Sequence, residues 1–138
     1  MNSSSPARPP RPLWLKLLAL SLLILSTAGW LRMGGSILRW NTLQAIGADP
    51  GPLYMAVTGL FLGTLAMAAS IAIWIRAKWA PLFTQIFIVL WLAWLWIDRA
   101  FFASSPNALA NWPFLLGASV LVLAIVFLVL QRGRKHFL

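Results

Sequence analysis

Four stretches of the sequence are long, apolar and almost free of charged residues: 13–31, 54–75, 79–97 and 112–130. A helix needs about 20 residues to cross the hydrocarbon core of a bilayer, and all four stretches have about that length. Within hydrocarbon the backbone finds no water, so each stretch must satisfy its own hydrogen bonds as an α-helix. The alternating pattern of a membrane β-barrel is absent. The sequence therefore predicts an all-α, integral membrane bundle of four transmembrane helices.

The composition explains why a soluble fold is excluded. Hydrophobic residues make up 61% of the 138 residues, and charged residues only 9%. A soluble domain has about 25% charged residues, and a small one leaves much of its surface in water. Lipid removes this conflict, because an apolar helix face is stable against hydrocarbon.

The basic residues predict an orientation. If all four stretches cross the bilayer, eight of the eleven basic residues fall on one side and three on the other. The two acids, Asp49 and Asp98, fall on the poorer side. Because Lys and Arg are in excess on cytoplasmic loops, we expect both termini in the cytoplasm and a multi-pass protein of the inner cell membrane. The cytoplasmic set is Arg8, Arg11, Lys16, Arg76, Lys78, Arg132, Arg134 and Lys135, and the outer set is Arg32, Arg39 and Arg99.

This pattern divides the chain into three parts. Residues 1–12 are rich in Ser, Pro and Arg and are expected to form a disordered cytoplasmic N-terminus. Residues 13–131 form the membrane domain, and 132–138 a basic cytoplasmic tail. An alternative is that the first stretch is a signal peptide cleaved near Ser26-Thr27-Ala28, which would leave three spans and an outer N-terminus. The apolar run continues through Trp30 and Leu31, which favours a span.

The connection after the first span is too apolar for a free loop. It runs from about Gly34 to Pro52 and predicts a short interfacial helix, although its polar and apolar faces are not cleanly separated. It acts either as a lid or docking surface or as a connector wrapped over the bundle. The second outer connection contains a predicted turn at Ser104–Asn107.

Small residues in the second span form a candidate helix-packing stripe. They let a neighbouring backbone approach closely, which favours association where lipid provides no hydrophobic drive. Packing within the chain is favoured, and contact with another subunit is the alternative. The stripe comprises Gly59, Gly63, Ala66 and Ser70.

Aromatic residues in the third span form a second candidate. Phe87, Trp91 and Trp94 lie on one helix face, which continues to Asp98. Such a stripe could hold an apolar ligand with a polar head, such as a quinone or lipid; core packing beside an aromatic belt is favoured over it. A carboxylate at the edge of hydrocarbon needs a partner, and Arg32 or Arg39 is the predicted ion-pair partner of Asp98.

The residue types also exclude several chemistries. The chain has no cysteine, so disulfide, thiol-redox and iron–sulfur chemistry are excluded. Its single histidine, His136, lies in the tail, which excludes a transmembrane bis-histidine haem. No nucleophile–base pair or phosphate-binding loop is present. We therefore predict no catalytic residues, no cofactor-binding residues and no metal site.

The net charge of +9 does not indicate nucleic-acid binding, because the basic residues flank apolar stretches and no base-stacking module accompanies them. The expected partners are the lipid bilayer and either other membrane subunits or further copies of this chain. The chain lacks the paired cysteines of four-span thiol oxidoreductases and the first-span glutamate of small multidrug exporters, and no family is recognised. The leading hypothesis is a small non-catalytic membrane protein, such as an accessory subunit, that acts through protein or lipid contacts. The alternatives are an oligomeric carrier or channel for a small or apolar solute, and an enzyme of lipid substrates that uses Asp98.

Overall fold

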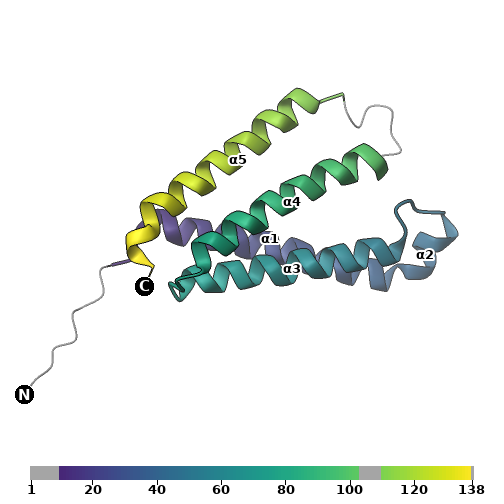
Figure 1. Ribbon diagram of the computed structural model, residues 1–138. Coiled ribbons are helices and arrows are strands. Elements are labelled where there is room, and N and C mark those ends of the chain that lie inside the picture. The colour runs from purple at the N-terminus through teal and green to yellow at the C-terminus, as the bar shows by residue number, and fades with distance from the viewer. Residues whose placement is uncertain (1–9, 103–109, 138) are drawn as a thin grey trace, which may run out of the picture.

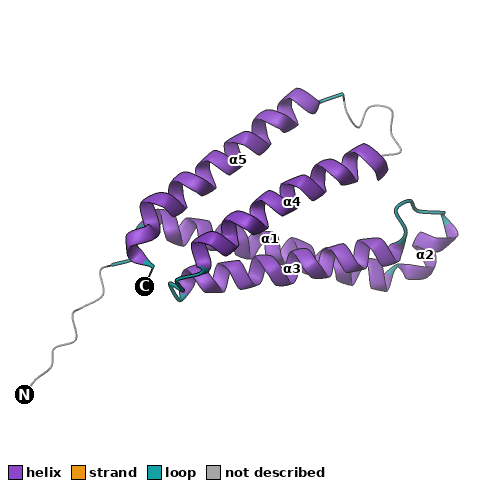
Figure 2. Ribbon diagram, viewed as in Figure 1, coloured by secondary structure: helices purple, strands orange, loops and turns teal. Residues whose placement is uncertain are grey.

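The computed structural model describes residues 10–102 and 110–137. Every regular element in this part of the chain is a helix (Figure 2). Most of the predicted disordered N-terminus and the predicted turn at Ser104–Asn107 lie outside the described residues. The elements are α1 (Leu13–Leu38), α2 (Trp40–Ala45), α3 (Pro52–Trp74), α4 (Ala80–Phe102), α5 (Trp112–Gly133) and the 3-10 helix η1 (Arg134–His136).

Four of these helices are long and apolar enough to cross a membrane: α1, α3, α4 and α5 with its extension η1. The prediction of four long apolar helices is therefore confirmed. Their direction across the membrane stays a prediction.

Two of the helices extend beyond the predicted stretches by five residues or more. α1 continues through Gly34 and Gly35 to Leu38, and α4 continues past Asp98 to Phe102. At a rise of 1.5 Å per residue, the 26 residues of α1 span about 39 Å, which exceeds a hydrocarbon core of about 30 Å. Neither extension contains proline, so helical hydrogen bonding continues beyond the apolar part.

The α1–α3 connection contains the short helix α2. It is the element expected from the apolar residues of this connection, and its location at a membrane surface stays a prediction. α3 then starts at Pro52, in the first turn, where the missing proline N–H costs no helical hydrogen bond.

α3 ends in a compact turn. The Ala77 N–H donates to the Ala72 carbonyl and the Arg76 N–H to the Ile73 carbonyl, the pair of bonds that closes a Schellman motif. Arg76 has a φ of 58°, the left-handed conformation in which glycine is usual at this position. The turn is short, so α4 returns beside α3.

The four long helices do not pack equally. α1 and α3 lie side by side along most of their lengths, whereas α4 and α5 diverge from that pair toward their far ends (Figure 1). The buried residues of α4 lie between Ala80 and Leu92, and those of α5 are Val126, Leu130 and Gly133. The hydrophobic core therefore lies in the half of the bundle where α1 starts and α5 ends.

The alternating helix directions gather the basic residues at that same half. The start of α1, the α3–α4 turn and the end of α5 lie at one end of the molecule, here called the basic end (Figure 1). Both acidic residues, Asp49 and Asp98, lie at the opposite end. The described basic-end residues are Arg11, Lys16, Arg76, Lys78, Arg132, Arg134 and Lys135.

Candidate functional site

The small-residue stripe of α3 faces α1. Gly59, Gly63, Ala66 and Ser70 are all buried. Gly59, Gly63 and Ser70 each lie against residues of α1. In the described structure the stripe therefore packs within the chain.

Three glycines allow the two helix backbones to come into contact. A Cβ atom on Gly29 would collide with the Gly63 backbone nitrogen, and one on Gly59 would lie 2.6 Å from the Met33 nitrogen. A Cβ on Gly63 would instead meet the indole ring of Trp30 at 3.0 Å. Backbone atoms in a helix cannot yield, whereas a side chain can turn away. Gly29 and Gly59 are thus the positions where this interface tolerates no side chain.

Two serine hydroxyls join the same helices. Ser26 Oγ donates to the Gly63 carbonyl at 2.7 Å, and Ser70 Oγ donates to the Ala19 carbonyl at 2.8 Å. All four residues are buried. Interhelical hydrogen bonds of this type in membrane proteins contribute about 0.6 kcal/mol each. They add direction to a contact whose main stabilisation is close packing.

The partner residues on α1 were not identified from the sequence. The signal was present, because Ala19, Ser26 and Gly29 are small and spaced by seven and three residues, which places them on one helix face. Ser26 was instead considered as part of a cleavage motif. Scanning every span for small residues at helical spacing would have found the complementary face.

A second cluster joins α3 and α4 at the end opposite the basic end. Tyr54 Oη donates to Asp98 Oδ1 at 2.7 Å. The Tyr54 ring lies 5.6 Å from the ring of Trp94 and 4.9 Å from that of Phe102, measured between centroids. The hydroxyl of Tyr54 thus satisfies one oxygen of a carboxylate at the edge of the apolar region.

The aromatic residues predicted as one stripe have different surroundings. Phe87 is 5% exposed and belongs to the hydrophobic core, with Trp91 packed beside that core. Trp94 is 38% exposed and packs on Tyr54. A ligand along these residues stays a prediction. The structure adds Tyr54, the only tyrosine in the chain, as the residue that connects Trp94 with Asp98.

The arginines proposed as partners of Asp98 are both exposed. Arg32 lies within α1, where its carbonyl accepts a hydrogen bond from Ser36 Oγ at 2.7 Å, and Arg39 follows the last residue of that helix. The ion pair of Asp98 with either arginine stays a prediction. The structure does provide this carboxylate with the hydrogen bond from Tyr54.

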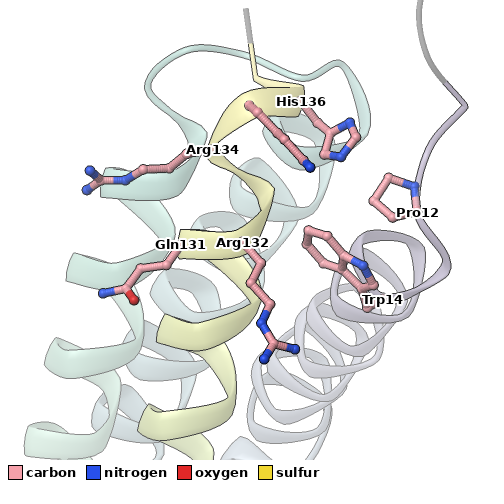
Figure 3. A pocket seen from close by; sticks show the side chains of 7 residues that line it. Pro12, Trp14, Gln131, Arg132, Arg134 and His136 are labelled. Carbon is pink, nitrogen blue, oxygen red and sulfur yellow. The ribbon is translucent and has the colours of Figure 1, made fainter.

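The basic end contains an open depression of about 640 Å³ between the start of α1 and the end of α5 (Figure 3). Two contacts bring these helix ends together. The rings of Trp14 and His136 meet edge to face with 6.2 Å between their centroids, and Gly133 packs against the Trp14 ring. The lining residues are Pro12, Trp14, Gln131, Arg132, Arg134, Lys135 and His136.

This depression was not predicted. The basic tail is predicted from the sequence, but it lies more than a hundred residues from Trp14. Only the antiparallel return of α5 to α1 places them together. The pairing depends on the close fit at Gly133, where a Cβ would lie 2.9 Å from the Trp14 ring.

Comparison with known proteins gives no relative: no protein-family model, curated protein or solved structure matches the chain. Within residues 10–102 and 110–137, no group of three or more His, Cys, Asp or Glu residues is placed to hold a metal ion. The four apolar helices fit a multi-pass membrane protein.

Proposed function

We propose that the protein is a non-catalytic accessory subunit of a membrane complex, and that it binds a transmembrane helix of its partner through residues 112–125 of α5. The observation that carries this proposal is the uneven burial of α5. Of its 22 residues, the buried ones are Val126, Leu130 and Gly133, all toward the basic end. The preceding residues are exposed or half-buried, and this part of α5 diverges from α1 and α3 (Figure 1).

Helices in a bilayer gain nothing from hiding apolar surface from lipid, so they associate through close packing and interhelical hydrogen bonds. Among the described residues, 112–125 have little of either. Trp96 Nε1 donates to Ser119 Oγ at 3.3 Å and so joins this part to α4. A partner helix would supply the packing that the chain itself does not.

Gly117 supports the same assignment. A glycine inside a helix costs about 1 kcal/mol relative to alanine, so its presence calls for a compensating gain. Gly29 and Gly59 have that gain, because a backbone lies against them. A Cβ on Gly117 would meet nothing within 4 Å. Close approach of a second helix at Gly117 would provide the missing contact.

The hydroxyl groups of the bundle favour an accessory subunit over the alternative carrier or channel. A solute path needs polar groups that converge on it, but those of Ser26, Ser70 and Tyr54 donate to other parts of the bundle. Thr84 is an exception within the described residues, since its buried Oγ1 has no hydrogen-bond partner there. A single hydroxyl does not make a path.

Native mass spectrometry after extraction in a mild detergent tests the proposal. We expect the wild-type chain at fixed stoichiometry with a second membrane protein, and the Gly117→Leu variant as a free chain that unfolds at no lower a temperature than the free wild-type chain. Gly34→Leu is the matched control, because a Cβ on Gly34 also meets nothing within 4 Å and the residue lies in another helix. Loss of the partner in both variants, or a free wild-type chain that moves a solute in liposomes, contradicts the proposal.

We also propose that the basic end faces the cytoplasm of an inner-membrane protein, because basic residues are retained on that side. The chain contains no cysteine, so its orientation can be tested by labelling single cysteines introduced at chosen positions. In intact cells, cysteine at the exposed position Lys78 should be protected from an impermeant thiol reagent, and cysteine at the exposed position Thr42 should react. Labelling at position 78 with protection at position 42 would mean that the basic end faces the outside.

A further inference from the structure

We propose that the depression at the basic end binds the phosphodiester headgroup of an anionic phospholipid. This inference goes beyond the proposed function, because it assigns a ligand to the opposite end of α5 from the partner surface. It rests on the charge, the donor groups and the position of the depression.

The charge of the lining is uncompensated by carboxylate side chains. Arg132, Arg134 and Lys135 contribute three cations, and no aspartate or glutamate lies at this end, since Asp49 and Asp98 are the only acids in the sequence. Like charges within one short segment repel one another, and an anion bound among them relieves that repulsion. The lining therefore favours an anionic ligand over a neutral one.

The donor groups suit a phosphate. A guanidinium offers paired N–H donors that match two phosphate oxygens, and a lysine ammonium adds a mobile point charge. In the view of Figure 3, Arg132 lies between Gln131 and Arg134 on one side and Trp14 on the other. The Gln131 side-chain amide is a further neutral donor. In Figure 3 the Gln131 and Arg134 side chains extend away from Trp14, but both are long and exposed, so they can turn toward a ligand in the depression. A tetrahedral anion is the ligand that would use several such donors at once.

His136 supplies a second, independent observation. Its Nδ1 atom is buried, yet within the described residues it has no hydrogen-bond partner. The residue lines the depression, and its ring is held there by the edge-to-face contact with Trp14. A buried polar atom without a partner is costly. A phosphate oxygen or a headgroup hydroxyl at this place would provide that partner.

The position of the depression selects a lipid rather than a soluble phosphate. It lies at the ends of two membrane-spanning helices, beside Trp14, a residue type that concentrates at the membrane–water interface. Apolar side chains continue from it along both helices: Leu13 is 71% exposed, and Leu17 and Leu128 are each 54% exposed. A phospholipid with its phosphate in the depression would lay its acyl chains along these residues. Basic pockets between helix ends on the cytoplasmic side are known to hold anionic headgroups.

The test measures lipid retention by native mass spectrometry on the full chain, with equal amounts of phosphatidylglycerol and phosphatidylcholine added in detergent. We expect preferential retention of phosphatidylglycerol, and a loss of that retention of about tenfold in the Arg132→Gln/Arg134→Gln variant. Both side chains are exposed, so the variant should fold, which a thermal unfolding curve checks.

Two further measurements distinguish lipid binding in the depression from a general effect of charge and from binding of free phosphate. The Lys16→Gln/Lys78→Gln variant removes the same charge from the same end but leaves the lining intact, and it should retain the lipid. Inorganic phosphate at millimolar concentration should not displace it. Equal retention of phosphatidylcholine, equal loss in both variants, or displacement by phosphate would each overturn the assignment. If the arginine variant fails to fold, Lys135→Gln replaces it, with a smaller loss expected from one charge.

Discussion

The α1–α3 pair and the α4–α5 pair are both apolar enough to cross a membrane but differ in how they pack. α3 buries ten of its 23 residues, and most of these are Gly, Ala or Ser, which allow α1 to approach backbone to backbone. α5 consists largely of Leu, Val, Ile and Phe, and it buries three of its 22 residues. Large side chains hold neighbouring helices apart and leave few interhelical contacts. Apolarity thus places a helix in the bilayer, whereas small residues determine which helices join closely.

The substitution with the largest expected effect disrupts the α1–α3 pair, which is the more closely packed of the two. Gly29→Ala should destabilise the protein by about 3 kcal/mol, the upper part of the usual range for overpacking, because the new Cβ meets the backbone of Gly63. The helices would have to separate, which would also strain the hydrogen bond from Ser26 to the Gly63 carbonyl. Reversible unfolding in mixed detergent measures the loss. Gly117→Ala in α5, where a Cβ has open space, is the control: it should not destabilise the protein, and the higher helix propensity of alanine should stabilise it by up to about 1 kcal/mol.

Gly63→Ala tests the same interface at a position where the added atom meets a side chain instead of backbone. The Cβ at this position meets the Trp30 indole rather than backbone, so the ring can turn and relieve the contact. We expect a cost of about 1 kcal/mol, the lower end of the overpacking range. The same unfolding measurement applies. A cost equal to that of Gly29→Ala would mean that Trp30 is as rigid as backbone.

The unequal packing also shows what the sequence could predict. Helix number and approximate position follow from hydropathy, because the bilayer imposes length and hydrogen bonding on each span separately. Gly59 and Gly63 were also recognisable, since their spacing is local. The contact of Tyr54 with Asp98 was not, because these residues are 44 positions apart and meet only through the particular alignment of α3 with α4. The lining of the depression at the basic end depends in the same way on how α5 meets α1.

Tyr54→Phe tests the contact that holds α4 to α3 where the two helices diverge. Removing the hydroxyl deprives Asp98 Oδ1 of its donor, and we expect a cost of about 1 kcal/mol, below the range for buried charged hydrogen bonds because the pair is partly exposed. A double-mutant cycle with Asp98→Asn measures the coupling.

The same cycle run with Arg32→Gln in place of Tyr54→Phe tests the predicted ion pair. Coupling of Asp98 to Tyr54 alone would assign the carboxylate to the hydrogen bond, and coupling to Arg32 would support the ion pair. Strict additivity in both cycles would contradict both contacts and leave Asp98 available to a ligand.

The smallest effects compare one hydroxyl from each pair of helices. Ser70 Oγ donates to the Ala19 carbonyl across the α1–α3 interface, and both residues are buried. Ser119 Oγ instead donates to the Leu115 carbonyl of its own helix at 2.8 Å and accepts a longer bond of 3.3 Å from Trp96 Nε1. A bond within one helix does not resist separation of two helices. Of the two hydrogen bonds of Ser119, only the one from Trp96 therefore bears on how α4 and α5 associate.

Ser70→Ala should therefore cost about 0.6 kcal/mol, the average for interhelical hydrogen bonds in membrane proteins, and Ser119→Ala less than that. Both variants keep the helix backbone and add no atoms, so overpacking does not enter the comparison. The measurement is again reversible unfolding, with the two single variants and the double variant analysed together. A larger loss for Ser119→Ala would mean that the half-buried α4–α5 contact stabilises the bundle more than the buried interface does, and it would reverse the ranking of the two helix pairs.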